Sequence, residues 1–190
     1  MNRSCRLTAE TKNYLTEFYK ILDTMIKGMT EAELTDSITH NFIVQMIPHH
    51  RAAIDMSYNL LEYSEWEPLR RIASGIITEQ TKSIADMEQL LSSGSPRRNS
   101  GQDLCLYQRK MDQIMKRMFE DMDQACSSND INANFMREMI PHHRGAVEMS
   151  CNALKFPIDP ALIPILEAII SSQEKGIRQM EQLLCRLGGK

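Results

Sequence analysis

The sequence predicts an all-α fold of two tandem helical-bundle repeats packed with pseudo-twofold symmetry, and three observations lead to this prediction. One sequence pattern occurs twice, at a constant offset of 93 residues, as from His49 to His142. In both copies the apolar residues step by three and four positions, which is the period of a helix and not of a strand. The 190 residues are 42% hydrophobic and 25% charged, which is the composition of a globular protein with a core of ordinary size.

The repeat is clearest around two Pro-His-His motifs. The segment from Asn41 to Asn59, which contains Met-Ile-Pro-His-His-Arg, recurs without a gap as the segment from Asn134 to Asn152. A stretch rich in serine, glycine and proline separates the two copies and has the composition of a linker. We therefore expect a first helical-bundle repeat at 1–94, a linker at 95–102 and a second repeat at 103–190.

Three helices are expected in each repeat. The first helices cover Leu15–Met29 and Met111–Met122, where the apolar spacing is helical. The third helices are expected over residues 66–91 and 159–184, and each begins with a proline, which suits the first turn of a helix. The Leu187-Gly188-Gly189 end is a stop signal for the last helix.

The second helix of each repeat carries the Pro-His-His motif. Thr35-Asp36 and Asn129-Asp130 are candidate N-caps, and the helices are expected to run to about residues 63 and 154. Pro48 and Pro141 fall inside these helices. Each proline removes one backbone hydrogen bond, so we expect a kink or a split into two helices.

Methionine is unusually frequent in this chain and follows the repeat. There are 14 methionines, whereas valine occurs only as Val44 and Val147. Ten of the methionines occupy five positions that are methionine in both copies, namely Met25, Met29, Met46, Met56 and Met87 with their partners 93 residues later. For a single methionine, filling an irregular core is the expected role. Methionines at fixed offsets from paired histidines favour metal binding instead.

Four of the five histidines lie in the two Pro-His-His motifs. At about 100° per residue they share a helix face with apolar residues, and we expect this face to point into the bundle. In the first repeat the face consists of Phe42, Met46, His49, Ala53, Met56 and Leu60, with His50 at its edge. A buried imidazole needs a hydrogen-bond partner or a metal, because an unsatisfied polar group costs about 1–3 kcal/mol.

The types of ligand narrow the choice of metal. Thioether and imidazole suit Cu(I) and, by the same softness, Ag(I), whereas calcium and magnesium prefer oxygen ligands. Zinc sites more often contain cysteine, or histidines with a carboxylate. No glutamate is followed by histidine three residues later, as di-iron bundles require, and no His-Glu-x-x-His motif occurs.

The two Met-Ile-Pro-His-His segments, each followed by a helix with glutamine and methionine seven residues apart, resemble the bacterial family catalogued as domain of unknown function 305. Their tandem arrangement is similar to copper-binding, copper-resistance proteins of cyanobacteria. The resemblance implies a ferritin-like four-helix bundle, a periplasmic or extracellular location and the binding of a copper ion. It assigns ten metal ligands, which are Met46, His49, His50, Met56, Met87, Met139, His142, His143, Met149 and Met180.

The expected function is therefore copper sequestration or resistance, with Cu(I) held by one site in each repeat and with Ag(I) or Cu(II) as further candidate ions. A copper efflux or delivery protein is a candidate partner. No enzyme is expected, because the chain has no phosphate-binding glycine loop and no nucleophile elbow. A b-type haem bundle, a phosphorelay bundle and a helical interaction module without ligand are the alternatives.

Composition and segment lengths exclude other partners. The net charge of −3 excludes a broad basic surface for nucleic acid. No apolar run approaches the ~20 residues of a membrane span, and the N-terminal residues Met1–Arg6 lack the apolar core of a signal peptide. The five cysteines form no CxxC pair, and we expect them to be buried as small hydrophobic residues. One disulfide among the four cysteines of the second half is the alternative in an oxidising compartment.

Overall fold

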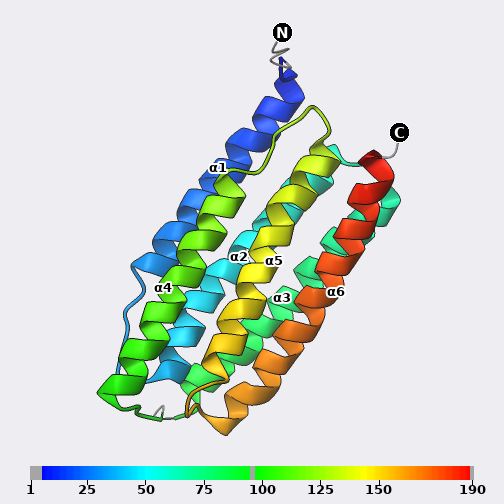
Figure 1. The fold of residues 1–190 in the computed structure, drawn as a ribbon. Coiled ribbons are helices and arrows are strands. Elements are labelled where there is room, and N and C mark those ends of the chain that lie inside the picture. Colours follow the sequence, from blue (N-terminus) through cyan, green and yellow to red (C-terminus); the bar gives the residue numbers. More distant parts are fainter. Residues whose placement is uncertain (1–5, 95–96, 189–190) are drawn as a thin grey trace.

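The computed structural model describes residues 6–94 and 97–188, and within them it contains six α-helices, one short 3-10 helix and no strand (Figure 1). This confirms the all-α prediction. The helices are α1 (Ala9–Thr30), α2 (Ile38–Tyr63), α3 (Glu67–Ser92), α4 (Gly101–Asp123), α5 (Ile131–Ala153), the 3-10 helix η1 (Pro160–Leu162) and α6 (Ile163–Gly188).

The six helices form three layers of two. Figure 1 shows α2 and α5 in the middle, with α1 and α4 on one side and α3 and α6 on the other. Helices α2 and α5 are antiparallel, since Thr39 at the start of α2 bonds Asp159 after α5, and Ser64 after α2 bonds Asn132 at the start of α5. Helices α2, α3, α5 and α6 each contact two others of this set. The four-helix arrangement around the histidines is thus built from both repeats, and not from one repeat alone.

The second helix of each repeat begins at equivalent positions. Its N-cap is Ser37 in the first repeat and Asp130 in the second, and each side chain accepts a hydrogen bond from a backbone N–H three residues later. The Asp130 cap was among the predicted positions, whereas Thr35-Asp36 was wrong by one residue. The Thr35 hydroxyl accepts a hydrogen bond from the N–H of Ser37 and so holds the turn before the cap.

Neither Pro48 nor Pro141 splits its helix, because α2 and α5 both run through the proline without interruption. Of the two predicted outcomes the split is wrong, and the kink stays a prediction. Close packing supports this segment: a Cβ added to Gly28 of α1 would lie 2.8 Å from Cβ of Pro48. Glycine at this position therefore lets α1 approach α2 at the proline.

The ends of α3 and α6 follow the sequence signals closely, whereas α1 and α4 begin six and ten residues before the predicted Leu15 and Met111. Helix α3 starts at Glu67, with Pro68 in its first turn. Asp159 caps η1, so the second proline starts a 3-10 turn that leads directly into α6. Helix α6 ends at Gly188, and Gly189 lies outside the described residues. Helix α4 already begins at Gly101, within the predicted linker 95–102, of which residues 95–96 also lie outside the described part.

The asparagines of the repeated motif have structural roles. Asn41 bonds both backbone groups of Thr35, and its equivalent Asn134 bonds both backbone groups of Ser128 in the same way. At the other end of the motif, Nδ2 of Asn59 donates to the backbone carbonyl oxygen of Tyr14 in α1 at 3.1 Å. Nδ2 of the equivalent Asn152 donates to the carbonyl oxygen of Tyr107 in α4 at 3.2 Å. The asparagines thus fix the ends of the helices that carry the histidines.

The cysteines do not behave as expected. Cys105, Cys126, Cys151 and Cys185 are exposed and free in the structure, while Cys5 lies outside the described residues. They lie on outward helix faces or in a loop, which the absence of a CxxC pair did not reveal. No helix among the described residues is long and apolar enough to cross a membrane.

Candidate functional site

The four histidines of the Pro-His-His motifs lie together at the centre of the molecule. Their side chains are buried, none of them more than 2% exposed. The predicted inward face of the first repeat is confirmed, because all its residues and their equivalents in the second repeat are buried. The six methionines assigned as ligands are also buried, namely Met46, Met56, Met87, Met139, Met149 and Met180.

The two inner histidines, His49 and His142, bring the repeats into direct contact. Their rings stack with centroids 3.6 Å apart and an interplanar angle of 29°. Nε2 of His49 donates to the carbonyl oxygen of His142 at 3.2 Å, and Nε2 of His142 donates to the carbonyl oxygen of His49 at 3.1 Å. In each repeat the ring of the outer histidine, His50 or His143, lies 5.9 Å from that of its inner neighbour. The repeats therefore share one histidine cluster, while the expectation of one metal site per repeat stays a prediction.

These hydrogen bonds determine the tautomer of the inner histidines. A carbonyl oxygen only accepts, so Nε2 of His49 and of His142 carries the proton and Nδ1 carries a lone pair. Nδ1 of each of the four histidines is buried and has no hydrogen-bond partner. Four unpartnered nitrogens in one core are unusual, because most buried polar atoms find a partner.

Burial keeps the four imidazoles neutral. Loss of solvent, reinforced by the neighbouring histidines, lowers the pKa of His50 to about 3 and lowers the pKa of His49 and His143 well below its usual range. Burial lowers the pKa of His142 to about 4, although its bond to the His49 carbonyl acts in the opposite direction. Neutral imidazole is the form that binds metals.

The histidines do not form a ready-made metal site by themselves. Within residues 6–94 and 97–188, no group of three or more histidine, cysteine, aspartate or glutamate side chains is placed to hold a metal ion. Any site here needs thioether ligands in addition to imidazole. Met46 lies three and four residues before His49 and His50, on the same side of α2, and Met139 has the same relation to His142 and His143 on α5.

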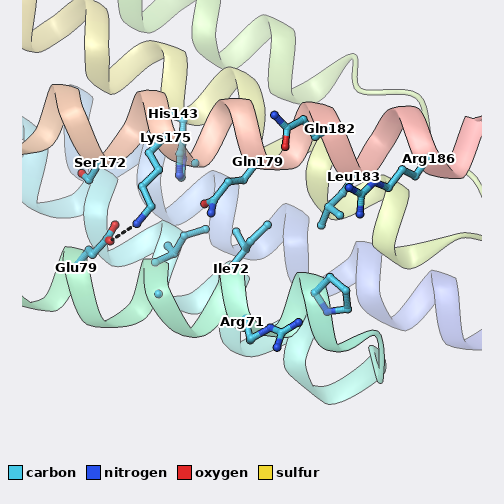
Figure 2. Close-up of a pocket in the computed structure, with 14 residues that line it drawn as sticks. Arg71, Ile72, Glu79, His143, Ser172, Lys175, Gln179, Gln182, Leu183 and Arg186 are labelled. Atoms are coloured by element: carbon cyan, nitrogen blue, oxygen red, sulfur yellow. Dashed lines mark ion pairs between the residues drawn. The ribbon is translucent and has the colours of Figure 1, made fainter.

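Two clefts between α3 and α6 lead from the surface to the outer histidines. The first has a volume of about 400 Å³ and is lined by Ile72, Ile76, His143, Lys175, Gly176 and Gln179 among others; we call it the His143 cleft (Figure 2). The second has about 450 Å³, and its lining includes His50, Gln80, Ser83, Ile165, Ile169 and Gln173; we call it the His50 cleft. Gln80 is buried and neither its Nε2 nor its Oε1 has a partner.

Comparison with known proteins places this arrangement in a family. The family described as domain of unknown function (DUF305) matches residues 39–184, which include both Pro-His-His motifs. The chain belongs to the DUF305 family. It is also similar to the crystal structure of a DUF305 fragment from Deinococcus radiodurans, with 26% identity over 78% of this chain and 96% of that chain and a TM-score of 0.57. No curated protein matches it.

This DUF305 chain also contains a buried carboxylate that the repeat pattern did not reveal. Glu138 precedes Met139 on α5, and its Oε2 accepts a hydrogen bond of 2.6 Å from the hydroxyl of Tyr14 on α1. Burial raises the pKa of Glu138 to about 7, although the Tyr14 hydrogen bond lowers it. The first repeat has Gln45 at the equivalent position. The signal in the sequence is the change from a neutral amide to a carboxylate at this position, directly before the repeated Met-Ile-Pro-His-His segment.

A second mismatch lies over the outer histidines. Ser83 donates or accepts a hydrogen bond of 3.1 Å with Nε2 of His50, whereas the equivalent Gly176 lies directly against the ring of His143. This mismatch between Ser83 and Gly176 is visible in the sequence. Only the structure shows that each one touches a histidine.

Proposed function

We propose that this DUF305 protein is a copper-binding protein that sequesters Cu(I) and thereby confers copper resistance. Its ligands are drawn from the four imidazoles of the histidine cluster and the six buried thioethers of the same repeats. The observation that carries the proposal is the set of unpartnered, neutral Nδ1 atoms in a methionine-lined core. A metal ion would bind the Nδ1 lone pair of an inner histidine, which is otherwise an unpaired acceptor in the core.

The donor set fits a soft monovalent ion. Thioether and neutral imidazole favour Cu(I), and Ag(I) shares this preference, while Cu(II) is a further candidate through imidazole. Because no three histidine, cysteine, aspartate or glutamate side chains of the described residues are placed together for a metal ion, methionine sulfur is needed to complete the coordination. Histidines buried away from solvent also keep the ion from water and oxidants, so binding rather than catalysis is the expected activity.

The cellular role follows from the same chemistry. The tandem arrangement resembles the copper-binding protein CopM of cyanobacteria, which supports a periplasmic or extracellular location and a ferritin-like classification of the bundle. A copper efflux or delivery protein is then the natural partner, since a sequestered ion must be passed on. A phosphorelay role is disfavoured, because a phosphate-accepting histidine must be exposed and these four are buried.

An anaerobic titration with Cu(I) in competition with bathocuproine tests the proposal. The expected result is at least one equivalent of copper held per chain against the competitor. His49→Ala should weaken all of the binding rather than remove half of it, because the His49 ring and the His142 carbonyl are bonded to each other. A stoichiometry near zero for the unmodified protein would overturn the proposal in favour of a module without ligand.

Two further variants separate ligand loss from loss of fold. Met46→Leu and Met139→Leu keep the side-chain volume and remove the sulfur, so the expected effect on stability is below about 1.5 kcal/mol. Both should weaken copper binding. His40→Ala is the matched control, because His40 is the one histidine outside the two motifs and its repeat equivalent is Ala133. If Met46→Leu and Met139→Leu both leave the copper affinity unchanged, as His40→Ala should, the assignment of these methionines as ligands is contradicted.

A further inference from the structure

The two outer histidines of the cluster are equivalent by sequence but differ in what covers them. His50 lines the His50 cleft, yet its side chain is fully buried and its Nε2 is hydrogen bonded to Ser83 Oγ at 3.1 Å. The outward nitrogen of this ring is therefore occupied. A ligand arriving through the His50 cleft must first break this hydrogen bond.

His143 lacks an equivalent hydrogen bond at its outward nitrogen. None of the described residues forms a hydrogen bond with either of its ring nitrogens, and it is 2% exposed where the other three motif histidines are 0% exposed. A Cβ added to Gly176 would lie 2.8 Å from Cδ2 and 2.9 Å from Nε2 of His143, so only glycine leaves the ring its present place. Figure 2 shows the His143 ring pointing from its helix into the cleft between α3 and α6.

We propose that His143 is the first ligand to receive the metal ion, through Nε2 at the floor of the His143 cleft, and that Gly176 keeps this access open while Ser83 closes the equivalent access at His50. This inference rests on the proposed copper binding and adds a route and a direction to it. The ion passes from His143 inward to the stacked pair His49 and His142. The two repeats are thus unequal in access although their motifs are the same.

Four charged side chains line the His143 cleft, and three of the four are cations. Lys175 lies beside the ring position but is paired with Glu79 at 3.8 Å. Arg71 and Arg186 are the other cations of the lining.

Chemical labelling of the metal-free chain with diethylpyrocarbonate tests the access directly, because this reagent attacks uncharged imidazole nitrogen. Modification is followed for each histidine by mass spectrometry, with His40 as the internal reference. His143 should react faster than His50 by up to about tenfold, since freeing Nε2 of His50 requires breaking a hydrogen bond worth about 0.5–1.5 kcal/mol. Equal rates at His50 and His143 would overturn the inference.

The repeat supplies matched variants for this test. Gly176→Ser copies the first repeat into the second and should slow labelling of His143, while Ser83→Gly should speed labelling of His50. The double variant should exchange the two rates. Circular dichroism and the melting temperature check that each variant is folded. If Gly176→Ser does not fold, the labelling rate of His50 in Ser83→Gly tests the inference by itself. If neither substitution changes the labelling rates of His50 and His143, the inference is overturned.

Uptake of Ag(I), a redox-inert substitute for Cu(I), then links access to metal binding. In stopped-flow mixing, Gly176→Ser should capture Ag(I) several times more slowly than the unmodified chain, with unchanged stoichiometry. Ser83→Gly should capture it faster. If neither substitution changes the rate of Ag(I) uptake, only the route through His143 is overturned. Labelling as expected but no uptake by the unmodified chain overturns the proposed function and the metal role of His143 together.

Discussion

Glu138 is the buried side chain whose charge depends most directly on pH near neutrality. Its carboxylate is held only by the Tyr14 hydroxyl, which remains protonated because burial raises the pKa of Tyr14 well above its usual range. The equivalent Gln45 is also buried but carries no charge, and its Nε2 donates to the carbonyl oxygen of Met29 at 3.3 Å and contacts Met115 Sδ at 3.8 Å. The repeat therefore compares a charged and a neutral residue at one position.

Glu138→Gln should stabilise the protein at alkaline pH and leave it nearly unchanged at pH 5. Folding raises the pKa of Glu138 from 4.5 to about 7. The folded state therefore holds a proton that the unfolded state has lost, so this group destabilises the fold as the pH rises from 4.5 through 7. Removing the charge should recover about 1–3 kcal/mol at pH 8. Urea unfolding at pH 5 and pH 8 measures the difference.

The exposed Glu62 provides the control for this prediction. Glu62→Gln should change stability by no more than about 0.5 kcal/mol at either pH, as for most surface substitutions. The same stability difference for Glu138→Gln at both pH values would mean that Glu138 is not protonated in the folded protein.

At the scale of elements, a glycine sets how closely α5 approaches α4. Gly145 of α5 faces Met118 of α4, and a Cβ at this position would overlap the Met118 Sδ and lie 2.9 Å from its Cγ. The equivalent pair in the first repeat is Ala52 with Met25. The first repeat thus accommodates a methyl group where the second has none, so α4 and α5 meet at this point with less room.

Gly145→Ala should destabilise the protein by about 1–3 kcal/mol, because the added methyl group forces Met118 out of its place in a packed core. Thermal or urea unfolding measures the loss. Gly75→Ala is the control: nothing lies within 4 Å of its added Cβ, and it sits inside α3. The control should be neutral or stabilise by up to about 1 kcal/mol. Equal effects of the two variants would show that helix propensity, not packing, governs Gly145.

At the scale of the whole molecule, the two repeats depend on each other. Helices α2 and α5 pack together, as do α3 and α6, so each repeat leaves an apolar face that only the other covers. The reciprocal histidine–carbonyl bonds lie in this interface. The expected side-by-side packing of two separate bundles is therefore better described as two three-helix units that complete one core.

Separated halves should not remain folded monomers. Expressed alone, residues 1–94 and 97–190 should self-associate or lose cooperative unfolding, because the interface otherwise exposes apolar surface. Mixed in equal amounts, the two halves should form a one-to-one complex with the helix content of the intact chain. Light scattering with size-exclusion chromatography measures the mass, and circular dichroism measures the helix content. A monomeric, cooperatively folding half would contradict the shared core.

The sequence by itself determined the local structure and much of the candidate site. Helical spacing placed the helices, and the constant offset identified the repeat. The face of α2 that carries Met46 and His49 was predicted to point inward, and burial confirms this. Local rules suffice here because helix formation and the choice of a buried face depend on residues a few positions apart.

Only the tertiary structure decided how the repeats combine. His49 and His142 are 93 residues apart, and their stacking depends on the antiparallel packing of α2 against α5, which no local spacing encodes. The hydrogen bond at Nε2 of His50, and its lack at Nε2 of His143, likewise depend on which residue of a neighbouring helix faces each ring. These contacts arise from burying apolar surface between whole helices, so the shared histidine cluster and its unequal access are properties of the assembled core.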